Sequence, residues 1–321
     1  MTERPRILVT RKITDPAEAR LQELFDARLN PEDRTHSADE LIALADGMDG
    51  LLVAAGDPIN TKVIVALPNS VRIIATLSVG HEHIDLDAAR ARGIPVTTTP
   101  GVLDNATAEM AMMLILCAAR RANEGFRLVR EDRWEGWTPT MLLGTEVSGK
   151  RLGIVGMGRI GQAVARMAKG FSMTVHYHNR SRLAAELESG AIFHEDVDSL
   201  LAVSNFLSLN CPLTPETTGF LNAERIAKLP DGAVVVNTAR GAVVDDDALI
   251  AALRSGKLAA AGLDVFTGEP AANPGYRDLD NVFVMPHLGS ATHEARDAMG
   301  YKCAENLLAV FEGREPPDRV A

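Results

Sequence analysis

The chain has 321 residues, of which 46% are hydrophobic and 24% charged, a composition typical of a globular protein with room for two cores. A formal net charge of −10 and a pI of about 5.3 argue against nucleic acid and anionic membranes as partners, because like charges repel. The three cysteines, Cys117, Cys211 and Cys303, are isolated, which predicts neither a disulfide framework nor a metal site and favours a reducing cytoplasm.

The first hundred residues alternate short apolar runs with helical patterns. Ser37 followed by Glu40 fits a capping box at the start of one helix. Strands separated by helices of this length predict a parallel sheet that is covered on both faces. The predicted strands are 6–10, 50–55, 72–77 and 94–99, and the predicted helices are 15–27 and 37–45.

A long helix is predicted from about Asp104 to Arg121. Its most apolar stretch, 110–119, is far shorter than the roughly 20 residues that a membrane span requires. An irregular stretch with two tryptophans follows, and then a second alternating series begins, so the chain is predicted to form two α/β domains joined by two long helices. The strands of this series are 151–156, 173–178, 206–210, 233–237, 258–266 and 281–286, and the last helix is 291–311.

The segment GMGRIG (156–161) follows a predicted strand and opens a predicted helix, which is the context of a dinucleotide-binding turn. Gly156 permits the tight turn, Gly158 lets the backbone approach a pyrophosphate, and Gly161 lets the helix pack closely on the strand. The anion is expected at the helix N-terminus, where free N–H groups favour negative charge. A glycine-rich turn without a ligand is the alternative.

The next predicted strand is followed by Asn179, Arg180, Ser181 and Arg182. An NAD-binding unit usually has an acidic residue here to hold the ribose 2′-hydroxyl, but none occurs between residues 174 and 185. The planar fork of arginine suits a 2′-phosphate instead. The segment therefore predicts NADP(H) in preference to NAD(H), and a solvated basic helix start is the alternative.

Three later strand-like runs end in residues that suit reduction of a 2-oxo acid. VVVNTARG presents Arg240, GLDVFTGEP presents Glu269 and VFVMPHLGS presents His287. In open α/β sheets, ligands bind beyond the carboxyl ends of the strands, so the three side chains can share one crevice. Histidine can donate a proton to the developing oxyanion, a carboxylate partner favours the charged imidazole, and arginine can anchor the substrate carboxylate.

Each of the three residues also has an ordinary interpretation. An arginine after a strand is usually at the surface, a glutamate before proline usually belongs to a turn, and a histidine at a strand end can cap a helix. Their joint position after the dinucleotide-binding turn is what favours the catalytic interpretation.

Eight segments carry a family resemblance over nearly the whole chain: SVGHEHIDL (78–86), GIPVTTTPGVL (93–103), NATAE (105–109), GMGRIGQAVA (156–165), CPLTPET (211–217), NTARG (237–241), AAGLDVF (260–266) and PHLGSAT (286–292). In these segments and their order the chain resembles the D-isomer-specific 2-hydroxyacid dehydrogenase family, and most of all its glyoxylate/hydroxypyruvate reductases.

The resemblance implies two doubly wound parallel-sheet domains. One is a flavodoxin-like substrate domain formed by 1–101 and 292–321, and the other is a Rossmann-type dinucleotide-binding domain over 102–291. It implies NADPH-dependent reduction of glyoxylate or hydroxypyruvate by a catalytic Arg240, Glu269 and His287, with no metal. The implied cofactor-binding residues are Thr107, Gly156, Gly158, Arg159, Ile160, Gly161, Asn179, Arg180, Ser181, Cys211, Pro212, Thr238, Ala239, Asp264 and Gly289. The implied substrate-binding residues are Val79, Gly80, Arg240, Ser290 and Trp137.

The family resemblance also implies a homodimer in which segment 120–150 is an exchanged arm. Trp137 resembles a tryptophan that reaches the partner's active site, and a dimer-interface aromatic is an equal alternative. His81 and Glu82 occupy positions that vary within the family beside the substrate loop, so either can alter substrate choice.

Two rival functions remain open at this stage. Another branch of the same family is the nearest, although Glu269 argues against formate dehydrogenases, which pair the histidine with glutamine. A dinucleotide-sensing protein like the family's transcriptional corepressors is the rival from another class, because such proteins can retain the triad.

Overall fold

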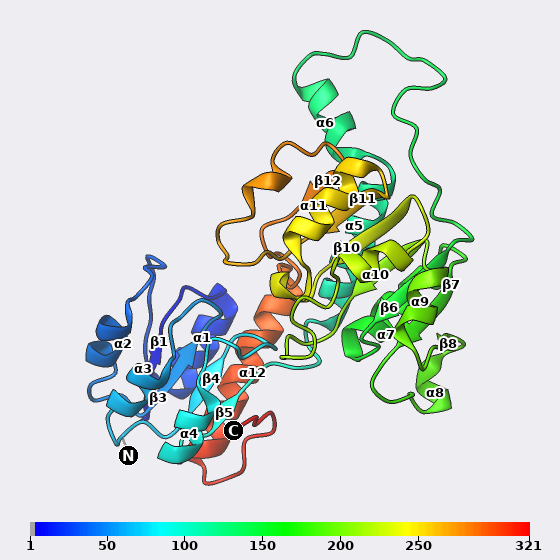
Figure 1. The fold of residues 1–321 in the computed structure, drawn as a ribbon. Coiled ribbons are helices and arrows are strands. Elements are labelled where there is room, and N and C mark those ends of the chain that lie inside the picture. The colour runs from blue at the N-terminus through cyan, green and yellow to red at the C-terminus, as the bar shows by residue number, and fades with distance from the viewer. Residues whose placement is uncertain (1–3) are drawn as a thin grey trace. The chain divides into compact units, whose positions relative to one another are not determined.

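The computed structural model describes residues 4–321, which form two compact units (Figure 1). The first unit consists of Met1–Leu103 and Ser290–Ala321, and the second of Asp104–Gly289. The boundaries expected from the sequence, at 101/102 and 291/292, differ from these by two residues each. No helix within residues 4–321 is long and apolar enough to cross a membrane.

The first unit is built on a five-stranded parallel sheet in the order β2-β1-β3-β4-β5. This is the flavodoxin-like order, in which the chain reverses direction across the sheet between β1 and β3. The strands are β1 (Arg6–Val9), β2 (Asp26–Arg28), β3 (Gly50–Val53), β4 (Ile74–Thr76) and β5 (Val96–Thr97), and the helices are α1 (Asp15–Leu24), α2 (Ala38–Leu44), α3 (Thr61–Ala66), α4 (Leu86–Arg92) and α12 (His293–Phe311).

Local signals set the helix ends of this unit. Ser37 and Glu40 form the reciprocal capping box expected at the start of α2. Gly93 ends α4 in the left-handed conformation that favours glycine. The last residues of the chain cover the edge of β5, since the Val320 N–H donates to the Val96 carbonyl at 2.8 Å. Covering this edge blocks pairing with another chain.

The second unit is built on a seven-stranded parallel sheet in the order β12-β11-β10-β9-β6-β7-β8. The chain starts at β6, proceeds outward through β7 and β8, and returns to β9 on the other side of β6, which is the Rossmann arrangement. The strands are β6 (Arg151–Val155), β7 (Thr174–His178), β8 (Ile192–Phe193), β9 (Phe206–Leu209), β10 (Ala233–Asn237), β11 (Leu258–Leu263) and β12 (Val282–Val284). The helices are α5 (Asp104–Ala119), α6 (Ala122–Arg130), α7 (Arg159–Lys169), α8 (Ala185–Glu188), α9 (Val197–Val203), α10 (Ala223–Lys228) and α11 (Asp246–Ser255).

Apolar side chains on both faces of this sheet are buried, as a parallel sheet requires. Leu207, Val235 and Leu263 belong to a core on one face, whereas Ile154 and Val234 belong to a core that also includes α5 and α7. In Figure 1, α6 and the loop that follows it extend away from the seven-stranded sheet of their own unit.

The structure confirms the predicted fold of two doubly wound parallel sheets. The two long helices predicted to join the domains are α5, which belongs to the second unit, and α12, which belongs to the first. Two short strands, β2 and β8, were not predicted. Both lie at a sheet edge and have only two or three residues, so they carry almost no apolar periodicity.

Candidate active site

The glycine-rich turn lies between β6 and α7, at the point where the strand order of the second unit reverses. Gly156 has φ +93°, and a Cβ there would lie 2.6 Å from the backbone nitrogen of Cys211, in the loop that follows the neighbouring strand β9. A Cβ at Gly161 would lie 2.3 Å from the Gly156 carbonyl oxygen. These two glycines are therefore required by the packing of the turn itself.

Gly158 has a different role, because a Cβ there would meet open space. It is the N-cap of α7 and supplies no side-chain cap to the first-turn N–H groups, including those of Arg159 and Ile160. An uncapped helix N-terminus behind an open glycine is suited to a pyrophosphate. The turn thus fits a dinucleotide by its own geometry.

The residues after β7 divide into structural and exposed groups. The Met157 N–H donates to Asn179 Oδ1 at 2.6 Å, so Asn179 holds the glycine-rich turn from the neighbouring strand. Arg180 and Ser181 are exposed beside it. The hydrogen bond from the Thr214 hydroxyl lowers the pKa of Glu216, and the charge of Arg180 adds a smaller effect in the same direction. The Arg180 guanidinium therefore lies near the loop that follows β9, which contains Glu216.

Arg182 is engaged elsewhere. Its guanidinium donates to both carboxylate oxygens of Glu188, at 2.7 and 3.1 Å, and the Tyr177 hydroxyl donates to the same carboxylate at 2.6 Å. The Arg182 hydrogen bond, followed by that of Tyr177, lowers the pKa of Glu188 to about 2. Of the two arginines that predict NADP(H), only Arg180 is without such a carboxylate partner among the residues described.

Glu269 and His287 are directly hydrogen-bonded, with 2.6 Å between Glu269 Oε2 and His287 Nδ1. The other Glu269 oxygen accepts the Phe266 N–H at 2.8 Å. Burial raises the pKa of Glu269, but these hydrogen bonds and the charges of His287 and Arg240 outweigh it, so the pKa lies below its usual range. An ionised carboxylate at Nδ1 orients the imidazole and leaves Nε2 for proton transfer.

Arg240 is held in the turn after β10 by a buried asparagine. Asn237 Oδ1 accepts the Ala239 N–H at 2.9 Å, and Asn237 Nδ2 donates to the Arg240 carbonyl at 2.9 Å. A Cβ on Gly241 would lie 1.9 Å from the Phe266 carbonyl carbon, so only glycine allows the Arg240 turn to pack against the segment leading to Glu269. The charge of Arg240 accordingly acts on Glu269.

Asp264 organises the loop that carries His287. Its Oδ1 and Oδ2 accept the N–H groups of Leu288 and Gly289, each at 2.7 Å, and its carbonyl accepts the His287 N–H at 2.8 Å. His287 is thereby held at φ +56°, a conformation that residues other than glycine rarely adopt. Burial raises the pKa of Asp264, and the two N–H groups offset part of this effect.

Sequence reasoning missed these positioning functions of Asn237 and Asp264. Asn237 was not predicted as a site residue, and Asp264 was predicted only as a contact of the cofactor. Both are 1% exposed; Asn237 is the last residue of β10, and Asp264 directly follows β11. A polar residue at the end of an otherwise apolar strand is the signal that points to them.

The remaining predicted cofactor residues of the second unit lie at the same carboxyl edge of the sheet or beside it. Burial raises the pKa of the Cys211 thiol to about 11. Thr107 of α5 packs next to Gly289, so it belongs to the surroundings of the His287 loop. The buried members of this group are Thr107, Cys211, Thr238, Ala239 and Gly289, and Pro212 is exposed.

The predicted substrate loop lies at the carboxyl end of β4 in the first unit. The Ser78 hydroxyl donates to the Gly80 carbonyl at 2.6 Å. The Thr76 hydroxyl lies 2.8 Å from the Ser78 hydroxyl and 3.1 Å from His83 Nε2. Within residues 4–321, the N–H groups of Val79 and Gly80 make no hydrogen bond. Two available N–H groups on a braced loop suit a carboxylate.

The other predicted residues lie outside these loops. Ser290 belongs to the first unit and precedes α12. Trp137 is 75% exposed in the loop after α6. In the part of the chain that the structure describes, no group of three or more His, Cys, Asp or Glu side chains is arranged to hold a metal ion.

A Rossmann sheet with an open glycine-rich turn and an acid–base pair at one edge defines a dinucleotide-dependent oxidoreductase. Comparison with known proteins agrees. Residues 112–289 match the NAD binding domain of the D-isomer specific 2-hydroxyacid dehydrogenases. The chain is 45% identical over 312 residues to a glycerate dehydrogenase of Hyphomicrobium methylovorum, with 97% of each protein covered.

Two further comparisons give the same result. A glyoxylate reductase of Thermococcus litoralis is 41% identical, over 99% of this chain and 97% of its own length. An NADPH-dependent glyoxylate/hydroxypyruvate reductase of Sinorhizobium meliloti, solved with NADP and malonate, is 33% identical with a TM-score of 0.88, over 99% of this chain and 97% of that one. The chain therefore belongs to the D-isomer-specific 2-hydroxyacid dehydrogenase family, and it is an oxidoreductase of 2-oxo and 2-hydroxy acids that uses a nicotinamide dinucleotide.

Proposed function

We propose that the protein is an NADPH-preferring reductase of a small 2-oxo acid, glyoxylate or hydroxypyruvate, acting as a homodimer in the cytoplasm. The observation that carries the reaction is the 2.6 Å contact between His287 and Glu269, next to the loop of Arg240. The cytoplasmic setting is supported by the three cysteines, all of which are free thiols.

His287 is the acid and base of the proposed reaction. As the carbonyl becomes a hydroxyl, the oxygen gains negative charge, and the protonated imidazole donates the Nε2 proton to it. Glu269 at Nδ1 favours the charged imidazole before transfer and keeps the ring oriented afterwards. In the oxidative direction the neutral imidazole takes the hydroxyl proton back.

Arg240 is the proposed anchor of the substrate carboxylate, because its guanidinium stays charged and can donate two parallel hydrogen bonds. The N–H groups of Val79 and Gly80 are the proposed second contact of that carboxylate. Ser290 is proposed to lie on the substrate side. Trp137 is proposed to reach the partner's site, as its exposure in a single chain allows.

NADP(H) would be held by the glycine-rich turn with its pyrophosphate at α7, and it supplies or accepts the hydride. Arg159, Ile160 and the loops after β9 and β10 would line the dinucleotide. Asp264 and Gly289 would lie near its nicotinamide. Arg180 and Ser181 are the proposed contacts of the 2′-phosphate, because they are exposed after β7 where an acidic residue would repel that group.

A panel of 2-oxo acids assayed with NADPH and NADH in parallel tests the reaction. We expect oxidation of NADPH with glyoxylate or hydroxypyruvate. Binding of NADPH without turnover of any 2-oxo acid would instead favour the dinucleotide-sensing, corepressor-like alternative.

Neighbouring arginines provide a matched pair for the cofactor preference. Arg180→Gln should raise the KM for NADPH about 10- to 100-fold and leave the KM for NADH nearly unchanged, because one charge-assisted contact is lost. Arg182→Gln is the control, since that side chain is bound to Glu188. Equal effects of the two variants, or a wild-type preference for NADH, would contradict the NADPH proposal.

The proposed dimer rests on apolar surface in the second unit. Exposed large apolar side chains cluster in the 120–150 arm, where they are Phe126, Val129, Trp134, Trp137 and Leu143.

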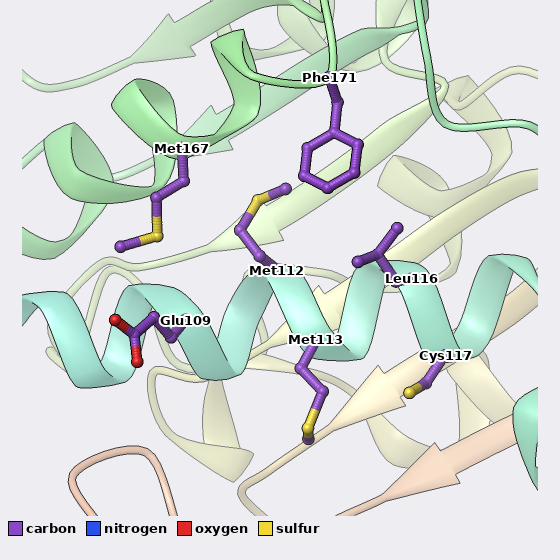
Figure 2. A pocket seen from close by; sticks show the side chains of 7 residues that line it. All are labelled: Glu109, Met112, Met113, Leu116, Cys117, Met167 and Phe171. Atoms are coloured by element: carbon purple, nitrogen blue, oxygen red, sulfur yellow. The ribbon is translucent and has the colours of Figure 1, made fainter. Parts of the chain in front are cut away.

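A second apolar surface lies beside α5. Figure 2 shows Met112 and Leu116 of α5 directed toward Met167 and Phe171, with Met113 and Cys117 on the other side of the helix. Clustered apolar surface of this kind is typical of subunit interfaces. The depression in Figure 2 is lined by Glu109, Met112, Met113, Leu116, Cys117, Met167 and Phe171.

Light scattering after size exclusion measures the oligomeric state. We expect twice the chain mass for the wild type and a shift toward monomer for Phe126→Ser combined with Trp134→Ser. Val65→Ser, at another exposed apolar residue, is the control. A monomeric wild type, or an unaffected double variant, would contradict the arm's role.

A further inference from the structure

Residues 180–181 form an exposed two-residue bridge between two fixed points of the second unit. Before the bridge, Asn179 Oδ1 accepts the Met157 N–H of the glycine-rich turn at 2.6 Å. After the bridge, the Leu183 N–H donates to the hydroxyl of Tyr177 at 3.1 Å. Because the bridge itself is exposed, its shape depends on what holds its two ends.

Tyr177 can serve as a fixed point because its ring is held firmly in the core. It lies in β7 and is 0% exposed. The centroid of its ring is 5.3 Å from that of Phe193, its partner on the neighbouring strand β8. Burial, followed by the hydrogen bond to Glu188, raises the pKa of Tyr177, so the hydroxyl keeps its proton.

Glu188 sets the direction in which the Tyr177 hydroxyl donates. An ionised carboxylate only accepts hydrogen bonds, so the hydroxyl gives its single hydrogen to Glu188 Oε1 at 2.6 Å. The lone pairs of the hydroxyl oxygen are then left to accept the Leu183 N–H. Carboxylate, hydroxyl and N–H thus form a directional chain that ends on the backbone of the loop after β7.

Arg182 binds the same carboxylate but lies outside this chain. Most of its side chain is exposed, whereas the Glu188 side chain is nearly buried. A substitution of Arg182 would leave the hydrogen bonds of Tyr177 to Glu188 and to Leu183 in place. The end of the bridge is therefore fixed by the tyrosine hydroxyl and not by the second arginine.

Resting on the proposed NADPH preference, we propose that Tyr177 is a positioning residue for the 2′-phosphate of the cofactor. Its hydroxyl holds the bridge in the shape in which Arg180 and Ser181 bind the phosphate together. A loop that is ordered in advance loses less conformational entropy on binding, so affinity rises for the cofactor that has the phosphate. NADH has a hydroxyl at that position and gains little. Tyr177 takes no part in hydride or proton transfer.

Two nucleotides that differ only by the 2′-phosphate test the proposal without turnover. Adenosine 2′,5′-bisphosphate and adenosine 5′-monophosphate are titrated by calorimetry into the wild type and into Tyr177→Phe, which keeps the ring and removes only the hydroxyl. We expect the Kd of the bisphosphate to rise about 3- to 15-fold and that of the monophosphate to stay within about twofold of wild type. The Kd values of NADPH and NADH, measured by fluorescence, should show the same split.

Two further variants separate positioning from a general loss of stability. Tyr276→Phe removes the hydroxyl of another buried tyrosine of this unit, which donates to Asp246 at 2.6 Å, and it should leave the ratio of the two Kd values unchanged. In Arg180→Gln, adding Tyr177→Phe should weaken binding of the bisphosphate by less than about twofold more, because the guanidinium to be positioned is already absent.

An unchanged ratio in Tyr177→Phe, an equal weakening of both nucleotides, or fully additive losses in the double variant would overturn the proposal. If Tyr177→Phe is not recovered folded, Glu188→Gln tests the same chain. Its neutral amide oxygen is a weaker acceptor, so the bisphosphate alone should bind about two- to fivefold more weakly, and an unchanged ratio overturns the proposal there as well. A wild type that binds the two nucleotides equally fails the proposed NADPH preference and the inference with it, whereas the other outcomes leave that preference standing.

Discussion

The carboxyl edges of the two sheets differ in the kind of group that they present. The edge of the seven-stranded sheet carries the ionisable pair Glu269 and His287, with Arg240 on the adjoining loop. The edge of the five-stranded sheet carries hydroxyls and backbone N–H groups around Ser78. The first edge is equipped to move a proton, and the second to hold an anion.

The side chains that hold the loops in place also differ between the two edges. Buried Asn237 and Asp264 fix the loops of the second unit through hydrogen bonds to backbone N–H and C=O groups. The Ser78 loop is braced by neutral hydroxyls. Catalysis is more sensitive to displacement than binding is, so the two buried supports, one an amide and one a carboxylate, stand where chemistry is proposed.

Among the side chains that bind or support and do not transfer the proton, the guanidinium on the catalytic edge should have the largest effect when it is lost. Arg240→Met is expected to lower kcat/KM for the 2-oxo acid about 100- to 1,000-fold, because the substrate carboxylate loses a charged, two-point contact. Arg240→Lys should recover only part of this. Steady-state kinetics with NADPH measures both, and a Met variant within a few fold of wild type would contradict the anchoring role.

Disturbing a support on the same edge should have the next largest effect. Asp264→Asn replaces one of two carboxylate acceptors by an amide donor, which cannot receive the N–H group that faces it. We expect kcat to fall about 10- to 100-fold while the thermal unfolding midpoint changes by only a few degrees. A large fall in the midpoint with unchanged kcat in the folded fraction would make Asp264 a residue of stability alone.

The Glu269–His287 pair leads to a prediction about how turnover depends on pH. The pKa of Glu269 lies below its usual range, so the carboxylate stays ionised through neutral pH and is lost only as pH falls through that lowered value. The fall in turnover that follows loss of this carboxylate should therefore lie on the acid side, below the usual range of a glutamate, and it should be absent in Glu269→Gln, whose amide does not titrate. An unchanged acid limb in Glu269→Gln would separate Glu269 from the proton transfer.

The smallest effect is expected on the five-stranded edge. Ser78→Ala removes one neutral hydrogen bond to the Gly80 carbonyl and should raise KM by a few fold with kcat nearly unchanged. A fall in kcat without a rise in KM would show that the five-stranded edge contributes to the chemical step, contrary to the proposed division between binding and catalysis.

Sequence patterns were sufficient for the elements with strong local signals. The apolar strands and the glycine-rich turn at 156–161 were predicted close to their observed positions. Arg240, Glu269 and His287 were predicted as a set because each ends a strand-like run, and parallel strands bring their carboxyl ends to one edge.

Contacts between distant residues were beyond sequence reasoning. Nothing in the local pattern shows that Arg182 is bound to Glu188, because the pairing depends on how α8 folds back beside β7. The support that Asp264 gives to Leu288 and Gly289 spans about two dozen residues, so it too is visible only once the strands are in place.

The division between the two edges is tested most directly by single-turnover oxidation of bound NADPH in His287→Gln. We expect the variant to bind NADPH with nearly the wild-type Kd, measured by fluorescence, and to oxidise it about 100- to 10,000-fold more slowly in the presence of saturating 2-oxo acid. A single-turnover rate within a few fold of wild type would contradict the account, because the proton would then come from elsewhere.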